Sequence, residues 1–496
     1  MDTDEETYIL ESDKQRLNSR LVFAFFSCVI GSSFVFGVHT GVVNLPQTKI
    51  EQFLNETELH RTGHHMTQSK ITLLWALIVS IWAIGGMIGG VNAGYFADKL
   101  GRKKGLLLNN ILTFLAVILF GFSKLALSYE MLIVGRFIAG IQCGISTGIA
   151  PLYLSEVAPL KLRGAAGTLN QLAIVFGVLI SQIIGMDFIL GTDKLWPILL
   201  SFPVIAAILQ LLTFSLCPES PKYLYINKND RYAAIRALQW LRSGDSFEEE
   251  LQDMQIQGES CENTEKMSIC GIFTTKWLRR PIFISIIMQL SQQLSGINAV
   301  IYYSTQIFRK TAHLTQTASQ FASIGVSVVN FIITAISASL VDKAGRRYLH
   351  LLGLGGMFCA ACALTTSFLW EVHWHFMSYI AIVATVIFVC SFAIGPGSIP
   401  WFIVAEMFSQ NTRPAAVSIA VLTNWFANFL VGLCYPLIQD EIKVYSFVPF
   451  IVFLGCLWIV IYFVLPETKG KTIDEISNYF RIMSNGSGLL STTEEE

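Results

Sequence analysis

The sequence DKLGRK at residues 98–103 returns as DKAGRR at residues 342–347, 244 positions further along the chain. Two further pairs repeat with almost the same separation. They are Glu156 with Arg163 against Glu406 with Arg413, 250 positions apart, and PESPK from Pro218 against PETKG from Pro466, 248 positions apart. Because chance matches would not keep this order and spacing, the chain is predicted to consist of two halves built on one pattern.

Both halves are apolar enough to cross a membrane repeatedly. The 496 residues are 53% hydrophobic and 14% charged, and their mean hydropathy is +0.55. Long runs without charge alternate with short basic clusters, which is typical of a polytopic membrane protein. Twelve spans are expected, with starts near Leu21, Leu73, Gly105, Glu130, Gly164, Lys194, Pro281, Thr317, Tyr348, Phe376, Thr412 and Tyr445.

The predicted fold class is an all-α membrane protein, with twelve transmembrane helices in two six-helix bundles and a cytoplasmic helical linker. The segment RYAAIRALQWL at residues 231–241 is amphipathic, which favours soluble helices in the linker. The expected boundaries are residues 1–20 for an N-terminal tail, 21–217 for the first bundle, 218–280 for the linker, 281–465 for the second bundle and 466–496 for a C-terminal tail.

Lysine and arginine follow alternate spans, for example at residues 99–104 after the second span and 343–347 after the eighth. By the positive-inside rule, both termini are expected in the cytoplasm. The first outer loop, about residues 44–70, then carries the sequon Asn55-Glu56-Thr57 on the side of the membrane where glycosylation takes place. Asn55 is therefore a candidate glycosylation site.

The stretch QLSQQLSGINAVIYY at residues 289–303 places amide and hydroxyl side chains inside an apolar span. Gln292 and Gln293 fall within about 60° of Gln289 on a helix of 3.6 residues per turn, so the three amides share one neutral face. Asn298 would point to roughly the opposite side unless the helix breaks near Gly296. A broken membrane helix is typical of a binding site, and a neutral amide face suits an uncharged polyol.

Several longer motifs accompany this stretch. They are GRFIAG from Gly135, YLSEVAPLKLRG from Tyr153, PESPKYL from Pro218, GPGSIPWFIVAE from Gly395, NWFAN from Asn424 and PETKGKT from Pro466. Together with the repeated loops they resemble the sugar porters of the major facilitator superfamily, and within them the facilitative glucose transporters, over residues 25–476. The resemblance implies a D-glucose uniporter of the plasma membrane that works by alternating access. It implies galactose and mannose as further substrates, and no cofactor.

The same resemblance implies a set of substrate-binding residues. They are Gln171, Gln292, Gln293, Asn298, Asn330, Trp401 and Asn428. An amide can donate to and accept from a sugar hydroxyl without carrying charge, and an aromatic ring can cover the C–H surface of a sugar. The alternative for any single amide is a hydrogen bond that only joins two helices, and the alternative for Trp401 is ordinary packing.

Two further features concern selectivity. Gln289, Leu290 and Ser291 match a tripeptide that distinguishes glucose carriers from fructose-preferring relatives, with helix packing as the alternative role. Ala393 stands where the resembled family usually has a glutamate, two residues before the GPG turn. One acceptor for a sugar hydroxyl is therefore missing, and water or Asn428 could substitute for it. An altered affinity or hydroxyl preference is expected.

The moving parts of such a carrier are expected in two places. Charged residues repeated in both halves match an intracellular latch of ion pairs across the halves, with fixed loop topology as the alternative role. They are Asp98, Arg102, Glu156, Arg163, Glu219, Asp342, Arg346, Glu406, Arg413 and Glu467. Gly395, Pro396, Gly397 and Pro400 interrupt the tenth span and are predicted to form a hinge.

Coupling to protons remains open at this point. His39 lies where resembled proton-coupled porters carry an aspartate and facilitative relatives carry an asparagine. It is either a neutral hydrogen-bonding residue or a proton site. A non-transporting sugar sensor is a third alternative, although the short tail after Phe480 disfavours it. An enzyme is not expected, because no nucleophile with a base, phosphate-binding loop or metal cluster stands out.

Overall fold

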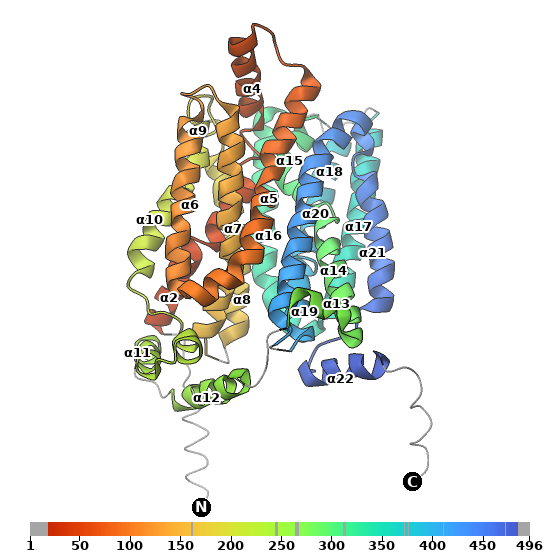
Figure 1. Cartoon of the computed structure of the whole chain (residues 1–496). Helices are drawn as coiled ribbons and strands as arrows, with labels where there is room; N and C mark the ends of the chain where they lie inside the picture. The colour runs from red at the N-terminus through yellow and green to blue at the C-terminus, as the bar shows by residue number, and fades with distance from the viewer. Residues whose placement is uncertain are drawn as a thin grey trace, which may run out of the picture.

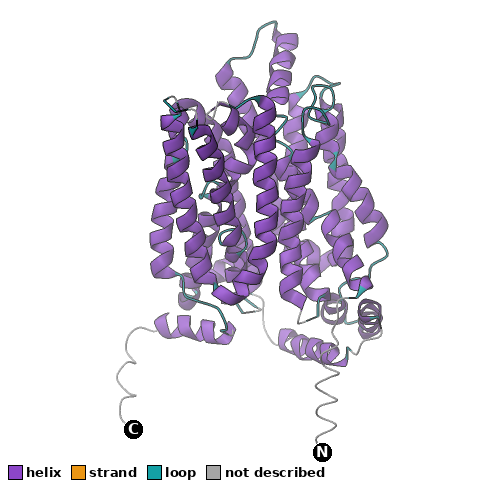
Figure 2. Cartoon of the chain, turned by 180° about the vertical axis from the view of Figure 1, so that it is seen from behind, coloured by secondary structure: helices purple, strands orange, loops and turns teal. Residues whose placement is uncertain are grey.

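The computed structural model describes residues 18–159, 162–243, 247–262, 267–310, 314–371, 373–374, 376–409, 411–471 and 473–484. Within these ranges every regular element is a helix, as Figure 2 shows, and none is a strand. The long helices run side by side through the length of the molecule. The prediction of an all-α protein is therefore confirmed.

The first half of the chain supplies six spans. They are α2 (Ser19–Ile30) continued by α3 (Ser33–Gly41), α5 (Gln68–Leu100), α6 (Arg102–Ser123), α7 (Tyr129–Val157), α8 (Arg163–Ile184), and α9 (Trp196–Ser201) continued by α10 (Pro203–Phe214). The second half supplies α14 (Arg279–Gln293) continued by α15 (Ile297–Lys310), α16 (Gln316–Ala344), α17 (Arg346–Trp370), α18 (Met377–Ile394) continued by α19 (Ile399–Met407), α20 (Arg413–Ile442) and α21 (Val448–Val464).

Ten of these spans in the described part of the chain are long and apolar enough to cross a membrane. The other two are α21, which is a shorter apolar helix, and the α14–α15 span, whose middle carries the amide and hydroxyl side chains of residues 289–298. With them the two bundles hold twelve spans, and each span begins within a few residues of its predicted start. The twelve-helix fold is confirmed.

Shorter helices lie at the two ends of the bundles. Figure 1 shows α4 (Gln47–Thr62) beyond one end, which we call the α4 end. At the opposite end, called the linker end, lie α11 (Arg231–Arg242), α12 (Glu248–Glu262) and α22 (Ile473–Ser484). The remaining short elements are the π-helix Tyr223–Asn227, α13 (Ile269–Thr274) and the 3-10 helices Lys276–Leu278 and Lys443–Tyr445. Helices in the linker are as predicted.

The break in the seventh span falls at Gly296, where it was predicted. Gly296 has a φ of +91°, which L side chains rarely adopt. A Cβ at this position would lie 2.7 Å from the ring of Phe450 in α21. Both the backbone conformation and the space therefore require glycine, and α15 starts in a new direction immediately after it.

The sequence repeat is also a structural repeat at the linker end. Gly101 and Gly345 precede α6 and α17 with φ values of +91° and +94°. The Glu219 carboxylate accepts hydrogen bonds from the N–H groups of Arg102, at 3.0 Å, and Lys103. Glu467 does the same for the first two N–H groups of α17. Each carboxylate thus neutralises the positive end of a helix dipole.

A second layer of the same repeat joins three segments of each half. Arg102 forms a bidentate ion pair with Glu156, with both N–O distances at 2.9 Å. Glu156 also accepts a hydrogen bond from the Ser220 hydroxyl. In the second half, Arg346 pairs with Glu406 at 3.1 Å, and Glu406 accepts from the Thr468 hydroxyl. The sequence pattern that is repeated in the two halves therefore corresponds to two matching networks of ion pairs and hydrogen bonds.

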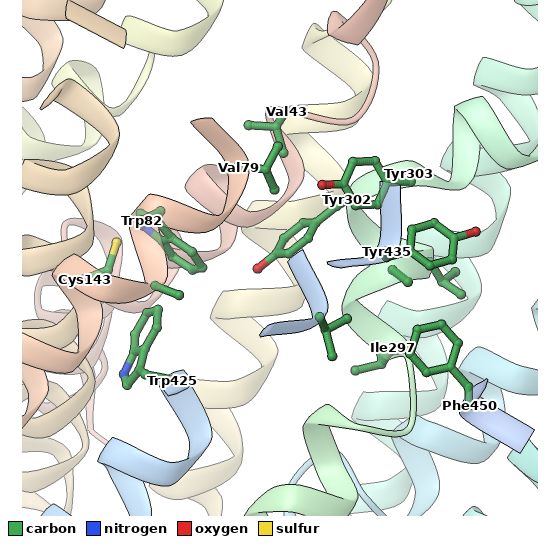
Figure 3. Close-up of a cluster of buried hydrophobic side chains, with 14 of the residues drawn as sticks. Val43, Val79, Trp82, Cys143, Ile297, Tyr302, Tyr303, Trp425, Tyr435 and Phe450 are labelled. Carbon is green, nitrogen blue, oxygen red and sulfur yellow. The ribbon is translucent and has the colours of Figure 1, made fainter. Parts of the chain in front are cut away.

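The halves meet mainly along two pairs of helices, α5 with α20 and α8 with α16. Trp425 of α20 reaches into the first half, where its ring centroid lies 4.9 Å from that of Trp82 and 5.6 Å from that of Phe36. Figure 3 shows the two tryptophan rings next to each other, and their planes are 71° apart in an edge-on arrangement. A Cβ at Gly86 would lie 2.4 Å from the Trp425 ring. The small residue therefore lets α20 approach α5 closely.

Replacing Gly296 with alanine is expected to destabilise the second half. The positive φ costs a residue with a side chain about 1 to 3 kcal/mol, and the new Cβ collides with Phe450. The melting temperature in detergent, followed by size-exclusion fluorescence, should fall. Gly325→Ala in α16 is the matched control, because its Cβ would meet no atom within 4 Å. Equal melting temperatures for the two variants would contradict this account of the break.

Candidate functional site

A cluster of buried amides lies in the middle of the second half. Asn424 of α20 donates to Gln289 Oε1 at 2.7 Å and to Gln292 Oε1 at 2.6 Å, and it accepts from Gln293 Nε2 at 3.0 Å. All four side chains are at least nine-tenths buried. The three glutamines therefore share one face of α14, as their spacing predicts, and Asn424 lies opposite that face.

The amide cluster is tied to the break in the tenth span. Between α18 and α19 the helix opens into a turn that includes Gly395, Pro396 and Gly397. Gln292 Nε2 donates to the carbonyl oxygens of Pro396, at 2.9 Å, and Gly397, at 2.7 Å. Carbonyls at a helix break need other donors. Gln292 donates to both carbonyl oxygens, so the predicted hinge residues Pro396 and Gly397 are hydrogen-bonded directly to the amide cluster.

Asn298 lies beside the cluster because of the break at Gly296. Its amide donates to Gln293 Oε1, although an unbroken helix would place Asn298 on the opposite face from Gln289. The redirection that the sequence predicts is thus observed. Gln292, Gln293 and Asn298 are brought together at one place.

Two other predicted residues lie on neighbouring helices with unused hydrogen-bonding groups. Asn428 of α20 accepts from the Tyr302 hydroxyl at 3.0 Å, and Asn330 of α16 accepts from Thr334 at 3.4 Å. Neither Nδ2 group has an acceptor among the described residues. Each of these amides can therefore donate to a small solute without first breaking a protein hydrogen bond.

Gln171 of α8 and Trp401 of α19 are half-buried, unlike the residues of the amide cluster. Their side chains make no hydrogen bond with another residue in the described ranges. A Cβ on Gly167, one turn before Gln171, would lie 3.9 Å from the ring of Phe402. The first half therefore approaches α19 near Trp401, and both residues have polar groups available between the halves.

The tripeptide predicted to set selectivity lies deeper than the other amides. Gln289 and Ser291 are fully buried, and Ser291 Oγ lies 3.0 Å from His350 Nε2 and donates to the carbonyl of Met288. Gln289 Oε1 accepts a hydrogen bond from Asn424, and Gln289 Nε2 lies 3.4 Å from the carbonyl oxygen of Pro400. Gln289, Leu290 and Ser291 could therefore influence a bound solute only indirectly, through the other residues of the amide cluster.

Ala393 is buried near the end of α18, close to the turn that Gln292 binds. Its methyl group offers no acceptor. An altered hydroxyl preference at this side of the site stays a prediction.

The predicted latch residues have their described ion pairs within one half of the protein. Asp98 lies 3.8 Å from Arg102, in addition to the Arg102–Glu156 and Arg346–Glu406 pairs described above. Arg413 donates to the carbonyl of Phe408. The side chains of Arg163 and Asp342 lie outside the described residues. Pairs across the halves are not among the contacts described, so a latch between the halves stays a prediction for another conformation.

Residues 24–480 match the family described as "Sugar (and other) transporter". The chain belongs to this family. It is 47% identical over 481 residues to "Solute carrier family 2, facilitated glucose transporter member 1" of Gallus gallus, covering 97% of both chains. It is 46% identical to "Solute carrier family 2, facilitated glucose transporter member 3" of Mus musculus, covering 94% of both chains. The relatives are transporters, so the prediction that the protein is not an enzyme is confirmed.

Solved structures support the fold. The proton:xylose symporter XylE bound to 6-bromo-6-deoxy-D-glucose superposes with a TM-score of 0.76 at 24% identity, over 93% of this chain and 99% of that one. A partially occluded inward open conformation of XylE from E. coli gives a TM-score of 0.75 at 23% identity, over 90% and 100%. Both confirm the major facilitator architecture of this sugar transporter family member.

His39 lies in α3 and is 1% exposed. Its carbonyl accepts from Arg136 Nη1 at 2.8 Å, and its Nδ1 has no partner among the described residues. Arg136 is also buried, donates to the carbonyl of Ile78 and lies 5.4 Å from the Trp82 ring centroid. No carboxylate pairs with Arg136 in the described residues. A proton on His39 would place a second cation beside it, which burial disfavours.

Asn55 lies within α4 and is half-buried. Its Oδ1 accepts from the N–H of Met66 at 2.8 Å, and its Nδ2 lies 3.1 Å from His65 Nδ1. Thr57 of the sequon is fully buried. Glycosylation at Asn55 stays a prediction, and it would require these local contacts to open.

Asn424 lies within the motif NWFAN but is not among the predicted site residues. The signal was present, since Asn424 and Asn428 are four residues apart and therefore share one face of a helix. Three buried hydrogen bonds make Asn424 the centre of the amide cluster.

Replacing Asn424 with alanine should weaken sugar transport by disturbing Gln292 and Gln293. Buried amides left without partners cost about 1 to 3 kcal/mol each, so a rise of about tenfold in the half-saturation concentration for sugar uptake is expected. Thr423→Val is the matched control, because that hydroxyl bonds only to the Ile419 carbonyl of its own helix. Half-saturation that is unchanged in Asn424→Ala, at equal surface abundance, would contradict this role.

Proposed function

We propose that this protein carries D-glucose across the plasma membrane by facilitated diffusion, through alternating access of one site between the two halves. The carrying observation is the group of neutral amides gathered from α14, α15, α16 and α20, in which the Nδ2 groups of Asn330 and Asn428 keep free hydrogen-bonding capacity. Amides match hydroxyls that both donate and accept, and the residues of the proposed site, all of them within the described part of the chain, include no carboxylate that would select an ion. The names of the relatives as facilitated glucose transporters support the same substrate.

In this proposal the α4 end faces outside, and the linker end faces the cytoplasm with both termini. Basic residues support this orientation, since Arg102, Lys103, Arg346 and Arg347 begin their helices at the linker end. The plasma membrane follows from the transport of external sugar. Neither the orientation nor the choice of membrane is inferred from the geometry of the amide cluster.

The α4 end is closed by hydrogen bonds between the halves. Asn44, which follows α3, donates to the carbonyl of Ile301 at 2.8 Å and to the hydroxyl of Ser304 at 2.7 Å. It also accepts from the N–H of Thr305 at 3.2 Å. Asn44 is 1% exposed, so these bonds lie out of water. One asparagine thus fastens the first half to α15.

Three other side chains extend this closure. Gln47 Nε2 donates to Gln306 at 2.6 Å, Thr72 donates to Asp440 at 2.6 Å, and Ser327 donates to Gln182 at 2.7 Å. We therefore assign the structure to an inward-facing state, in which sugar exchanges with the cytoplasm.

Transport would then proceed by rocking of the halves about the amide cluster. Sugar from outside is held by Gln171, Asn298, Asn330, Trp401 and Asn428, next to Gln293. Closure of the linker end would bring the latch residues of the two halves together, and each exposed pair contributes only about 0 to 1 kcal/mol, so the latch can reopen. Galactose and mannose are proposed as further substrates, with hydroxyl preference altered by Ala393.

Proton-coupled transport is less well supported than uniport. A proton on His39 would lie beside the buried cation of Arg136, and no carboxylate among the described residues is available there to take up a proton. No contact among the described residues favours a sugar sensor that does not transport. The uniporter is therefore the function proposed, and His39 is proposed to act as a neutral residue.

Purified protein in liposomes loaded with glucose is expected to take up external radiolabelled glucose by counterflow, because one carrier exchanges sugar in both directions. The initial rate should not change when a proton gradient is imposed. Unlabelled galactose and mannose should compete more strongly than fructose. Accumulation of glucose above the internal concentration under a proton gradient would contradict uniport, and exchange no faster than in empty liposomes would contradict transport.

Asn44→Ala should loosen the closure of the outer end. It removes three hydrogen bonds that are each worth about 0.5 to 1.5 kcal/mol, so the outward-facing population rises. Because apparent affinity scales with the competent fraction, the external half-saturation concentration for glucose uptake should fall several-fold, together with the maximal rate. Asn92→Ala is the control, since its amide bonds within its own helix. An unchanged half-saturation concentration would contradict the gate assigned to Asn44.

A further inference from the structure

A fully buried histidine lies on α17 beside the amide cluster. His350 is 0% exposed, and its Nε2 lies 3.0 Å from the hydroxyl oxygen of Ser291 in α14. An ionisable side chain inside an apolar span is costly and usually has a function. Since α17 packs mainly against α18 and α21, the imidazole reaches a helix outside the main packing partners of α17. The His350–Ser291 contact therefore joins α17 to the helix that carries the three glutamines.

The hydrogen bond between these two side chains has a defined direction. The Ser291 hydroxyl donates its one hydrogen to the carbonyl oxygen of Met288 at 2.7 Å. Its oxygen can then only accept from His350, so we assign the ring hydrogen to Nε2. Nδ1, which has no partner among the described residues, is then the nitrogen without hydrogen. His350 thus acts as a neutral donor toward α14.

The same part of α17 contacts the turn in the tenth span. A Cβ on Gly395 would lie 2.4 Å from the carbonyl oxygen of Leu349 and 3.1 Å from the Cα of His350. A Cβ on Gly353, about one turn after His350, would lie 2.5 Å from the Cδ of Pro396. No side chain fits between the two backbones at these points. The turn therefore lies directly against α17 beside His350.

Two adjacent residues connect α14 to this assembly. Gln292 donates to the carbonyl oxygens of Pro396 and Gly397 in the turn, and Ser291 accepts from His350. Neighbouring residues of a helix point about 100° apart, so the contacts hold α14 from two directions. Because α17 also contacts the turn, the three segments support one another. Rotation of α14 about its axis would break at least one of these contacts.

We propose that His350 is a positioning residue for sugar recognition, which acts through Ser291 to fix the direction in which α14 presents Gln292 and Gln293. The proposal rests on the transport of D-glucose through the amide cluster. A binding site discriminates between similar ligands when its polar groups are held within about 0.5 Å of their productive geometry. Loss of the His350–Ser291 bond therefore weakens the preference for glucose, whereas transport itself continues. Ser291 of the predicted selectivity tripeptide thereby acts on the sugar without touching it.

The test measures initial uptake of radiolabelled glucose by cells that express the full chain, with unlabelled glucose or fructose as competitor and with rates normalised to surface abundance. His350→Leu removes the donor and should raise the half-saturation concentration for glucose by about tenfold, with the maximal rate within about twofold of the unmodified protein. The ratio of the fructose to the glucose concentration that halves uptake should fall. An unchanged half-saturation concentration, or a fall in the maximal rate alone, would overturn the proposal.

His350→Gln separates positioning from packing. The glutamine Nε2 can donate to Ser291 as the imidazole Nε2 does, although the two side chains differ in shape. His350→Gln should therefore restore the half-saturation concentration for glucose to within about threefold of the unmodified value. A half-saturation concentration as high in His350→Gln as in His350→Leu would show that the shape of the imidazole matters instead of its donor, and would overturn the proposal.

Ser291→Ala removes the same hydrogen bond by a smaller change, and it decides the question by itself if His350→Leu does not reach the surface. It should raise half-saturation as much as His350→Leu, and the double variant should do no more, because both remove one bond. Ser285→Ala is the matched control, since Ser285 is equally buried on α14 but bonds to the Pro281 carbonyl of its own helix.

Two results of this series would count against the proposal, and a third would count against the function on which it rests. Half-saturation that is unchanged in Ser291→Ala, or effects of the two single variants that add in the double variant, would overturn the role of His350. If the unmodified protein showed no saturable glucose uptake, the proposed function itself would be wrong.

Discussion

The interaction on which the site depends is the pair of hydrogen bonds from Gln292 to the carbonyls of Pro396 and Gly397. A membrane helix can open only where its freed carbonyls find donors, because lipid offers none. The Gln292 amide supplies both donors, and its oxygen is held in turn by Asn424. The two interrupted spans of the second half are therefore joined at their breaks. Movement of the turn before α19 would therefore shift the amide cluster as well.

Much of this arrangement could be predicted from the sequence because it follows from local rules. The repeated motifs predict two halves, and each motif proves to be a glycine with positive φ followed by a helix whose start is capped by a glutamate. The break at Gly296 follows from the mismatch between Asn298 and the face of Gln289. Such inferences need only helix periodicity and the special backbone of glycine.

The contacts between distant segments could not be predicted in the same way. Asn424 lies 131 to 135 positions from the glutamines that it binds, and Asn44 lies 257 to 261 positions from its partners in α15. No periodicity in one helix reveals which helix packs against it. The latch illustrates the converse, since the sequence predicts ion pairs across the halves, whereas the described ion pairs of these charged residues join segments of one half. Sequence indicates which side chains are polar, whereas tertiary packing selects their partners.

The saturation of the amide cluster bears on the half of the cycle in which no sugar is carried. Gln292 and Asn424 use every amide hydrogen on neighbouring protein groups. These two side chains therefore add little to the cost in lost hydration when the unloaded protein closes around the empty site. A carrier that can reorient without a bound sugar supports net flux, whereas a carrier that cannot do so is an obligate exchanger. The self-paired amides therefore favour net movement of sugar down its gradient.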